Sequence, residues 1–225
     1  MSGNNSWNGM IKAGGVSLLA GGIIFFTFIL SVFIFQVQLP LTAQGYLDNT
    51  TAPTLLFTLA AVGEFLLMPG VFGIYFSIKE INENRMLLGT AIWISSIPMF
   101  LVSRGQVISL ATIAGNYAAS TDTTLRTAYF VAVQLALDLS GVFVTMALIL
   151  LGVGGIILGS VMLKGVFGKP TGYLVILAGA LTAMGTFGVL LEPLTIGTLF
   201  GLILNGVWQT IIGVKLIRLG GKKES

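Results

Sequence analysis

Six long apolar runs, separated by short polar breaks, dominate this sequence. The runs cover about residues 16–37, 55–78, 86–110, 141–163, 171–190 and 195–217. A helix needs about 20 mostly apolar residues to cross a bilayer core of roughly 30 Å, and each run has that length. The pattern therefore predicts an all-α, polytopic transmembrane bundle of six spans.

The residue content excludes a soluble domain and several kinds of chemistry. Only 8% of the 225 residues are charged and 55% are hydrophobic, whereas soluble domains carry about 25% charged residues. The chain has no Cys and no His, so it cannot supply a disulfide, a thiol nucleophile, an imidazole base or a zinc cage. We expect no cofactor, no metal site and no enzyme, since an intramembrane hydrolase would have only Glu64 and Asp138 as its carboxylate pair.

The cations predict an orientation, because Lys and Arg prefer cytoplasmic loops. Six spans place both termini on one side. If that side is the cytoplasm, only Arg104 and Arg126 of the 11 cations lie in or beyond the outer half. The others lie at the cytoplasmic face: Lys12, Lys79, Arg85, Lys164, Lys169, Lys215, Arg218, Lys222 and Lys223. We therefore expect an integral protein of the cell membrane with cytoplasmic termini, and no nucleic-acid partner. Lys215, Arg218 and the tail lysines are secondary candidates for holding anionic lipid headgroups.

The same runs define the expected organisation. Residues 1–15 form a cytoplasmic N-terminal segment, residues 16–217 a single six-helix transmembrane domain, and residues 218–225 a basic cytoplasmic tail. Between the third and fourth runs, residues 121–124 are expected to start a short outer helix that leads into span four. The alternative is a single long, tilted span.

Two ionisable residues lie inside spans, where such residues are costly and usually face a bundle interior or a wet cavity. Glu64 lies about 21 Å from the inner end of span two, and Arg104 about 27 Å along span three, at 1.5 Å per residue. The difference of about 6 Å is within the reach of an Arg side chain. The sequence therefore predicts a Glu64–Arg104 ion pair in the outer half of the membrane.

Other polar residues come near the level of this pair. Asp138 precedes span four, Glu192 lies between spans five and six, and Gln106 follows Arg104. Gln134 and Asp138 are four residues apart, on one helical face. We expect these side chains to form a polar chamber that serves as a pathway for a ligand or ion. The alternative is that the ion pair only fixes helix register and that Asp138 caps span four.

Span six carries small and amide side chains at every fourth residue. They are Gly197, Gly201, Asn205, Gln209 and Gly213. Such a ridge favours close helix packing with interhelical hydrogen bonds from the amides. Gly155 and Gly159 of span four have the same spacing and are the expected partner surface, and lining of a pathway is the alternative.

Three features carry a resemblance to a known family. They are the hairpin segment Phe76-Ser77-Ile78-Lys79, the intramembrane Arg104, and residues 158–170 with the Gly-rich residues 172–179 that follow. The chain resembles, over about residues 10–217, the uncharacterised prokaryotic six-span membrane family called domain of unknown function 4386. It departs from that family after Pro170, where Thr171-Gly172 replaces the usual Ile-Leu-Gly. The resemblance implies the six-span topology and no activity.

Two functional hypotheses follow. In the first, the protein binds or transports a small cation, a proton or a polar solute through the chamber around Glu64, Arg104 and Asp138. In the second, it is a non-catalytic structural or accessory subunit of a membrane complex or homo-oligomer, and its Gly-rich faces contact other chains. Membrane lipids are partners in both.

Overall fold

The computed structural model describes residues 7–34, 41–189 and 194–221, and all regular structure in these residues is helical. Five helices are long and apolar enough to cross a membrane: α1 (Asn8–Ile34), α3 (Thr51–Ile78), α4 (Glu83–Ala119), α5 (Thr123–Met162) and α7 (Leu194–Gly220). Shorter elements are α2 (Ala43–Asp48), η2 (Lys79–Ile81), α6 (Lys169–Gly185) and η3 (Thr186–Val189). The predicted all-α fold is confirmed in the described residues, and the five candidate spans fit a helical membrane bundle but not the predicted six spans.

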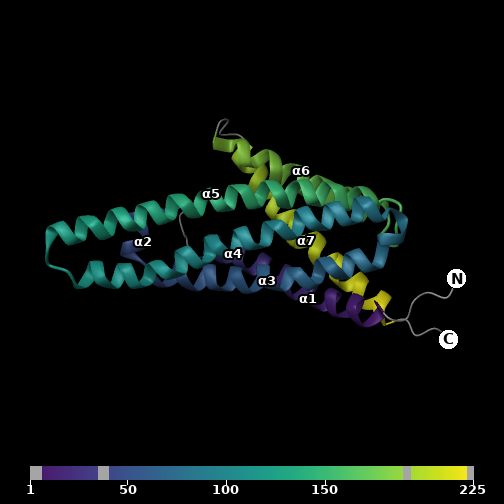
Figure 1. Cartoon of the computed structure of the whole chain (residues 1–225), viewed down its shortest axis with the longest axis horizontal. Coiled ribbons are helices and arrows are strands. Elements are labelled where there is room, and N and C mark those ends of the chain that lie inside the picture. Colours follow the sequence, from purple (N-terminus) through teal and green to yellow (C-terminus); the bar gives the residue numbers. More distant parts are fainter. Residues whose placement is uncertain (1–6, 35–40, 190–193, 222–225) are drawn as a thin grey trace.

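The six main helices form a closed ring in chain order. Each packs against the next, from α1 through α3, α4, α5 and α6 to α7, and α7 returns to α1. The start of α1 and the end of α7 lie together at one end of the bundle (Figure 1), where a β-carbon on Gly220 would be 2.7 Å from the Asn8 carbonyl oxygen. α1 begins at Asn8, inside the segment predicted to precede the domain.

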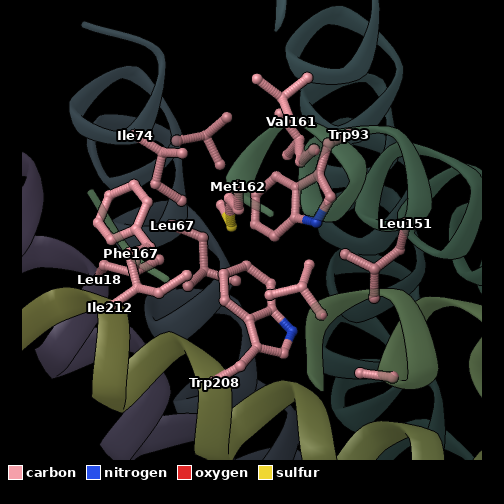
Figure 2. Close-up of a cluster of buried hydrophobic side chains, with 14 of the residues drawn as sticks. Leu18, Leu67, Ile74, Trp93, Leu151, Val161, Met162, Phe167, Trp208 and Ile212 are labelled. Atoms are coloured by element: carbon pink, nitrogen blue, oxygen red, sulfur yellow. The ribbon is translucent and has the colours of Figure 1, made fainter. Parts of the chain in front are cut away.

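The centre of the ring is filled with apolar side chains. Trp93 of α4 and Trp208 of α7 are fully buried, and their rings meet edge to face at a centroid distance of 6.3 Å. Leu67 of α3 and Leu151 of α5 belong to the same cluster (Figure 2). Because side chains from several helices meet here, the part of the ring around the two indoles is a packed core.

Glycines allow neighbouring helices to approach closely, most clearly between α5 and α6. A β-carbon on Gly152 would lie 2.6 Å from the carbonyl oxygen of Gly179, and one on Gly179 would lie 2.6 Å from that of Gly152. Backbone thus faces backbone at this crossing, and no side chain can fit between the two helices. Small residues serve this purpose in membrane bundles, because dispersion contacts between helices replace the hydrophobic effect.

α4 and α5 form a hairpin that is much longer than the other helices. With 37 and 40 residues, they measure about 55 and 60 Å at 1.5 Å per residue, close to twice the thickness of a bilayer core. Figure 1 shows the hairpin projecting from the rest of the ring, with α2 beside it. We call α4 from Val107 onward, together with α5 up to Leu139, the hairpin extension.

The expected short outer helix before span four is wrong as a separate element. The side chain of Asp122 caps α5 by accepting from the backbone N–H groups of Thr124 at 2.7 Å and Leu125 at 3.3 Å. From this cap the helix runs to Met162 without a break, as in the alternative of one long span. Asp138 therefore lies inside α5 and does not cap a helix. No proline interrupts residues 123–162, and Gly141, where span four was expected to start, is accommodated in the helix.

α2 packs against the hairpin extension, at the end of the bundle away from the start of α1 and the end of α7. Tyr46 is fully buried, and its hydroxyl donates to the carbonyl oxygen of Val107 at 2.9 Å and lies 3.0 Å from the Thr54 hydroxyl. Burial raises the pKa of the Tyr46 phenol, and the hydrogen bond with Thr54 opposes this more weakly. The phenol therefore keeps its proton at neutral pH and remains a donor to α4.

The glycine contact between α5 and α6 gives a direct test of the packing. Gly152→Ala places a methyl group against the Gly179 carbonyl oxygen, so we expect a loss of about 1–3 kcal/mol in the free energy of unfolding. Gly141→Ala on the same helix is the matched control, because a β-carbon there meets nothing within 4 Å. Thermal unfolding in detergent measures both. Equal midpoints for the two variants would contradict the close approach.

Candidate functional site

The predicted ion pair between Glu64 and Arg104 is present and buried. Arg104 donates through Nε at 3.1 Å and through Nη2 at 2.8 Å, in both cases to Oε1 of Glu64. The exposed fraction of the side chain is 8% for Arg104 and 2% for Glu64. The pair joins α3 to α4. On its other side, α4 packs against α5.

Three phenylalanine rings surround the guanidinium of Arg104. Its Cζ lies 5.5 Å from the ring centroid of Phe28, 5.1 Å from that of Phe57 and 5.4 Å from that of Phe100. These rings come from α1, α3 and α4. A cation within about 6 Å of an aromatic face is attracted by the negative charge of the ring face, more strongly where water is excluded. The cage therefore supplies part of the stabilisation that water would give an exposed guanidinium.

Only one of the two carboxylate oxygens of Glu64 accepts hydrogen bonds from the part of the chain that the structure describes. Oε1 receives both bonds from Arg104, whereas Oε2 is buried and has no hydrogen-bond partner among the described residues. An unpaired carboxylate oxygen in an apolar setting is costly. This oxygen is consequently the one place at the ion pair where a further hydrogen-bond donor can bind.

A hydroxyl pair next to the ion pair joins α4 to α5. Ser103, adjacent to Arg104 in the chain, and Ser140 are both buried, and their Oγ atoms lie 2.7 Å apart. This contact sets the height of α5 relative to α4 at the level of Arg104. Through it and the ion pair, three consecutive helices of the ring are held in register.

The other residues predicted to line a chamber lie elsewhere. Asp138 is exposed, and Gln134 donates to it through Nε2 at 2.9 Å along the same helix, α5. Gln106 is half-buried, and its Oε1 lacks a hydrogen-bond partner in the part of the chain that the structure describes. Glu192 lies outside the described residues. The structure thus brings Glu64 and Arg104 together and places Gln134 and Asp138 on the outer surface of the hairpin extension.

The row of small and amide residues on α7 packs against two helices, with Gly197, Gly201 and Asn205 facing α6 and Gln209 and Gly213 facing α1. Asn205 is buried and donates through Nδ2 to Oγ1 of Thr182 at 2.9 Å and to the carbonyl oxygen of Gly201 at 2.8 Å. Its Oδ1 accepts from Nε1 of Trp208 at 2.8 Å. Gly201 faces Thr182, and Gly197 lies more loosely near Leu181. The interhelical amide bond expected for Asn205 is therefore found.

The expected partner surface for this row is wrong. Gly155 and Gly159 of α5 face α6, where β-carbons on them would approach Gly179 and the carbonyl oxygen of Gly172. The reason is the order of the ring, in which α6 lies between α5 and α7. Gln209 is buried near Gly22 of α1, and its Oε1 has no hydrogen-bond partner among the described residues.

Two features of the polar groups were missed from the sequence. The aromatic cage was one, although the spacing of Phe100 and Arg104, four residues apart, places them on one helical face. The other is the contact of Lys215 with the connection between α5 and α6, because the sequence indicated only a role in topology and, secondarily, in binding lipid headgroups. Nζ of Lys215 donates to the carbonyl oxygen of Phe167 and to Oγ1 of Thr171, both at 2.7 Å.

No protein-family model, curated protein or solved structure matches this chain. The resemblance to domain of unknown function 4386 therefore stays a prediction. What the site can do is argued below from its own geometry.

The ion pair predicts a characteristic pattern of stability. Arg104→Met leaves an unpaired buried carboxylate, so we expect a loss of about 3–5 kcal/mol in the free energy of unfolding. Adding Glu64→Gln removes that charge, and the double variant should be more stable than Arg104→Met alone. Unfolding of the two single variants and the double variant, in the same detergent, measures this coupling. Additive losses would contradict it.

Proposed function

We propose that this multi-pass membrane protein is a non-catalytic accessory subunit of a membrane assembly and that it docks through the hairpin extension. The observation that carries the proposal is the length of α4 and α5, which exceeds the bilayer core by about 25–30 Å. This excess lies at the end opposite to the start of α1 and the end of α7 (Figure 1). A bundle that only spans the bilayer does not require helices of this length.

The surface of the hairpin extension is unsuited to water. Large apolar side chains are exposed on α5, at Leu125, Val131, Leu135 and Leu139. In residues 107–139 the only charged residues are Asp122, Arg126 and Asp138. An exposed apolar surface outside the bilayer indicates a protein contact.

The exposed face of α4 has the spacing of a surface on which another helix can pack. Exposed residues spaced alternately three and four apart run along it, at Val102, Gly105, Ser109, Thr112, Asn116 and Ala119, and Ala111, Gly115 and Ala118 beside them are exposed as well. This is the spacing at which two helices pack side by side along a seam. β-carbons on Gly105 and Gly115 would meet nothing within 4 Å, whereas the glycines between α5 and α6 are filled by a neighbour. The occupant we propose is therefore an apolar helix of another chain.

The ring interior supports the accessory role over transport. Glu64 and Arg104 are nearly inaccessible, and Trp93 and Trp208 meet in the packed core. The hypothesis of a proton or small-cation site at Glu64 remains a second candidate, and the unpartnered Oε2 is the observation in its favour. The variant that combines Glu64→Gln with Arg104→Met separates the ion-site hypothesis from the structural one. If the pair is an ion site, this variant loses whatever phenotype deletion of the chain abolishes. If the pair is structural, the folded variant keeps that phenotype.

We further propose six crossings with both termini in the cytoplasm. α6 has 17 residues and η3 continues it by four, which together measure about 34 Å and match a bilayer core. Within the described residues, Lys12, Lys79, Arg85, Lys164, Lys169, Lys215 and Arg218 are the cations that the proposal places at the cytoplasmic face. The proposed localisation is the cell membrane.

The absence of cysteine makes this topology easy to test with single-cysteine variants. Ser120→Cys lies at the turn of the hairpin, and Glu83→Cys lies at the opposite end of α4. We expect a membrane-impermeant maleimide to label Ser120→Cys on intact cells and Glu83→Cys only after permeabilisation. The reverse pattern would invert the proposed orientation.

A photo-crosslinking amino acid tests the docking proposal. Placed at Thr112, on the seam of α4, it should give a crosslinked product of one defined mass in the native membrane. The mass distinguishes a second copy of this chain from a different subunit. Phe72 of α3 and Leu177 of α6 are the matched controls, because they are exposed on transmembrane helices and should crosslink to lipid. Lipid products alone from Thr112 would refute the docking proposal.

A further inference from the structure

The connection between α5 and α6 carries two exposed cations and is joined to a third, Lys215 of α7, by hydrogen bonds. Lys164 and Lys169 are exposed at its two ends, and Arg218 is exposed on α7, one turn beyond Lys215. In the part of the chain that the structure describes, the ion pair of Glu64 with Arg104 is the only one within 4.0 Å. None of these four cations is therefore neutralised by a carboxylate of the described residues.

Lys215 is fixed in place within this group. Its ammonium reaches from α7 to the connection and donates two of its three N–H bonds, to the carbonyl oxygen of Phe167 and to Oγ1 of Thr171, each at 2.7 Å. No described residue accepts a hydrogen bond from the third N–H, which a ligand can therefore use. A lysine held by two hydrogen bonds loses less conformational freedom on binding than a free one, which favours affinity.

The backbone of the connection adds to the positive potential. The turn ends at Gly168, whose φ of 80° is a conformation that side chains rarely adopt, and α6 follows directly. Gly168 provides no side-chain cap for α6, and Pro170 in the first turn has no N–H, so only the backbone N–H groups of Lys169 and Thr171 precede the first helical hydrogen bond, from Gly172 to the Gly168 carbonyl. Apolar and aromatic groups flank the cations, since Val166 and Tyr173 are about 60% exposed.

From this arrangement we propose that Lys164, Lys169, Lys215 and Arg218 bind the phosphate of an anionic phospholipid. The cations contact the headgroup, and Val166 and Tyr173 contact the upper part of its acyl chains. This combination favours a lipid over free phosphate, which has no use for an apolar rim. The inference goes beyond the accessory role and does not depend on it, since it concerns the opposite end of the molecule from the hairpin extension.

Native mass spectrometry of the full chain in nanodiscs tests the proposal. The nanodiscs contain phosphatidylcholine with a minor fraction of phosphatidylglycerol, and the measurement is the occupancy of retained phosphatidylglycerol. We expect Lys164→Gln with Lys169→Gln to weaken retention by about 10-fold or more, because each cation near the surface contributes substantially to binding of anionic lipid. Lys12→Gln with Arg85→Gln is the control, which removes two charges from the same end of the bundle but not from this connection.

Each outcome decides the question. A selective loss in the first double variant supports the site, provided that both variants keep the thermal midpoint of the wild type. Equal losses in the two double variants would show a diffuse surface charge and overturn it, as would a wild type that retains both lipids equally. Displacement of the lipid by millimolar inorganic phosphate would point to a free-phosphate site and overturn the lipid assignment. If the double variant does not fold, Lys169→Gln alone should give a loss of about fivefold.

Discussion

The arrangement of the helices depends on where polar side chains find hydrogen-bond partners in an apolar bundle. Polar side chains in the ring depend on partners within the protein, because the bilayer supplies none, and a few buried atoms such as Oε2 of Glu64 have none among the described residues. The bonds that result are placed between consecutive helices. Glu64 and Arg104 join α3 to α4, Ser103 and Ser140 join α4 to α5, and Asn205 and Thr182 join α6 to α7. A few polar contacts thus fix the relative heights of helices whose apolar surfaces would allow sliding.

Between these points, close packing at glycine provides the remaining contacts. α5 meets α6 backbone to backbone at Gly152 and Gly179, and α1 meets α3 in the same way at Gly14 and Gly73. Such contacts require matching heights, because a shift of one residue would bring a side chain against the facing backbone. Polar hydrogen bonds and glycine contacts therefore favour the same relative heights of neighbouring helices. A shift that breaks one kind of contact also disturbs the other.

The sequence predicted the parts of the structure that depend on position along a helix. The Glu64–Arg104 pair followed from rise per residue, and the apolar runs followed from span length. Predictions that depended on which helices are neighbours were less successful. Gly155 and Gly159 were matched to α7, because small-residue spacing identifies a packing face without identifying its partner. The outer helix was separated from span four because Gly141 and the polar residues near it resemble a boundary. The Asp122 cap starts a helix, however, and nothing in residues 123–162 ends it.

The position of the buried charge bears on both functional hypotheses. The ion pair lies near the base of the hairpin extension and away from the apolar core around Trp93 and Trp208. Without a fixed height at this point, the extension would transmit no defined orientation to a partner. The Phe28, Phe57 and Phe100 cage ties the base to α1 and α3 as well. A buried ion pair is a poor source of stability compared with apolar packing, and it is well suited to specifying one arrangement. Under the proposed docking role, the cost of burying Glu64 and Arg104 would be offset by the rigid presentation of the hairpin rather than by added stability of the bundle.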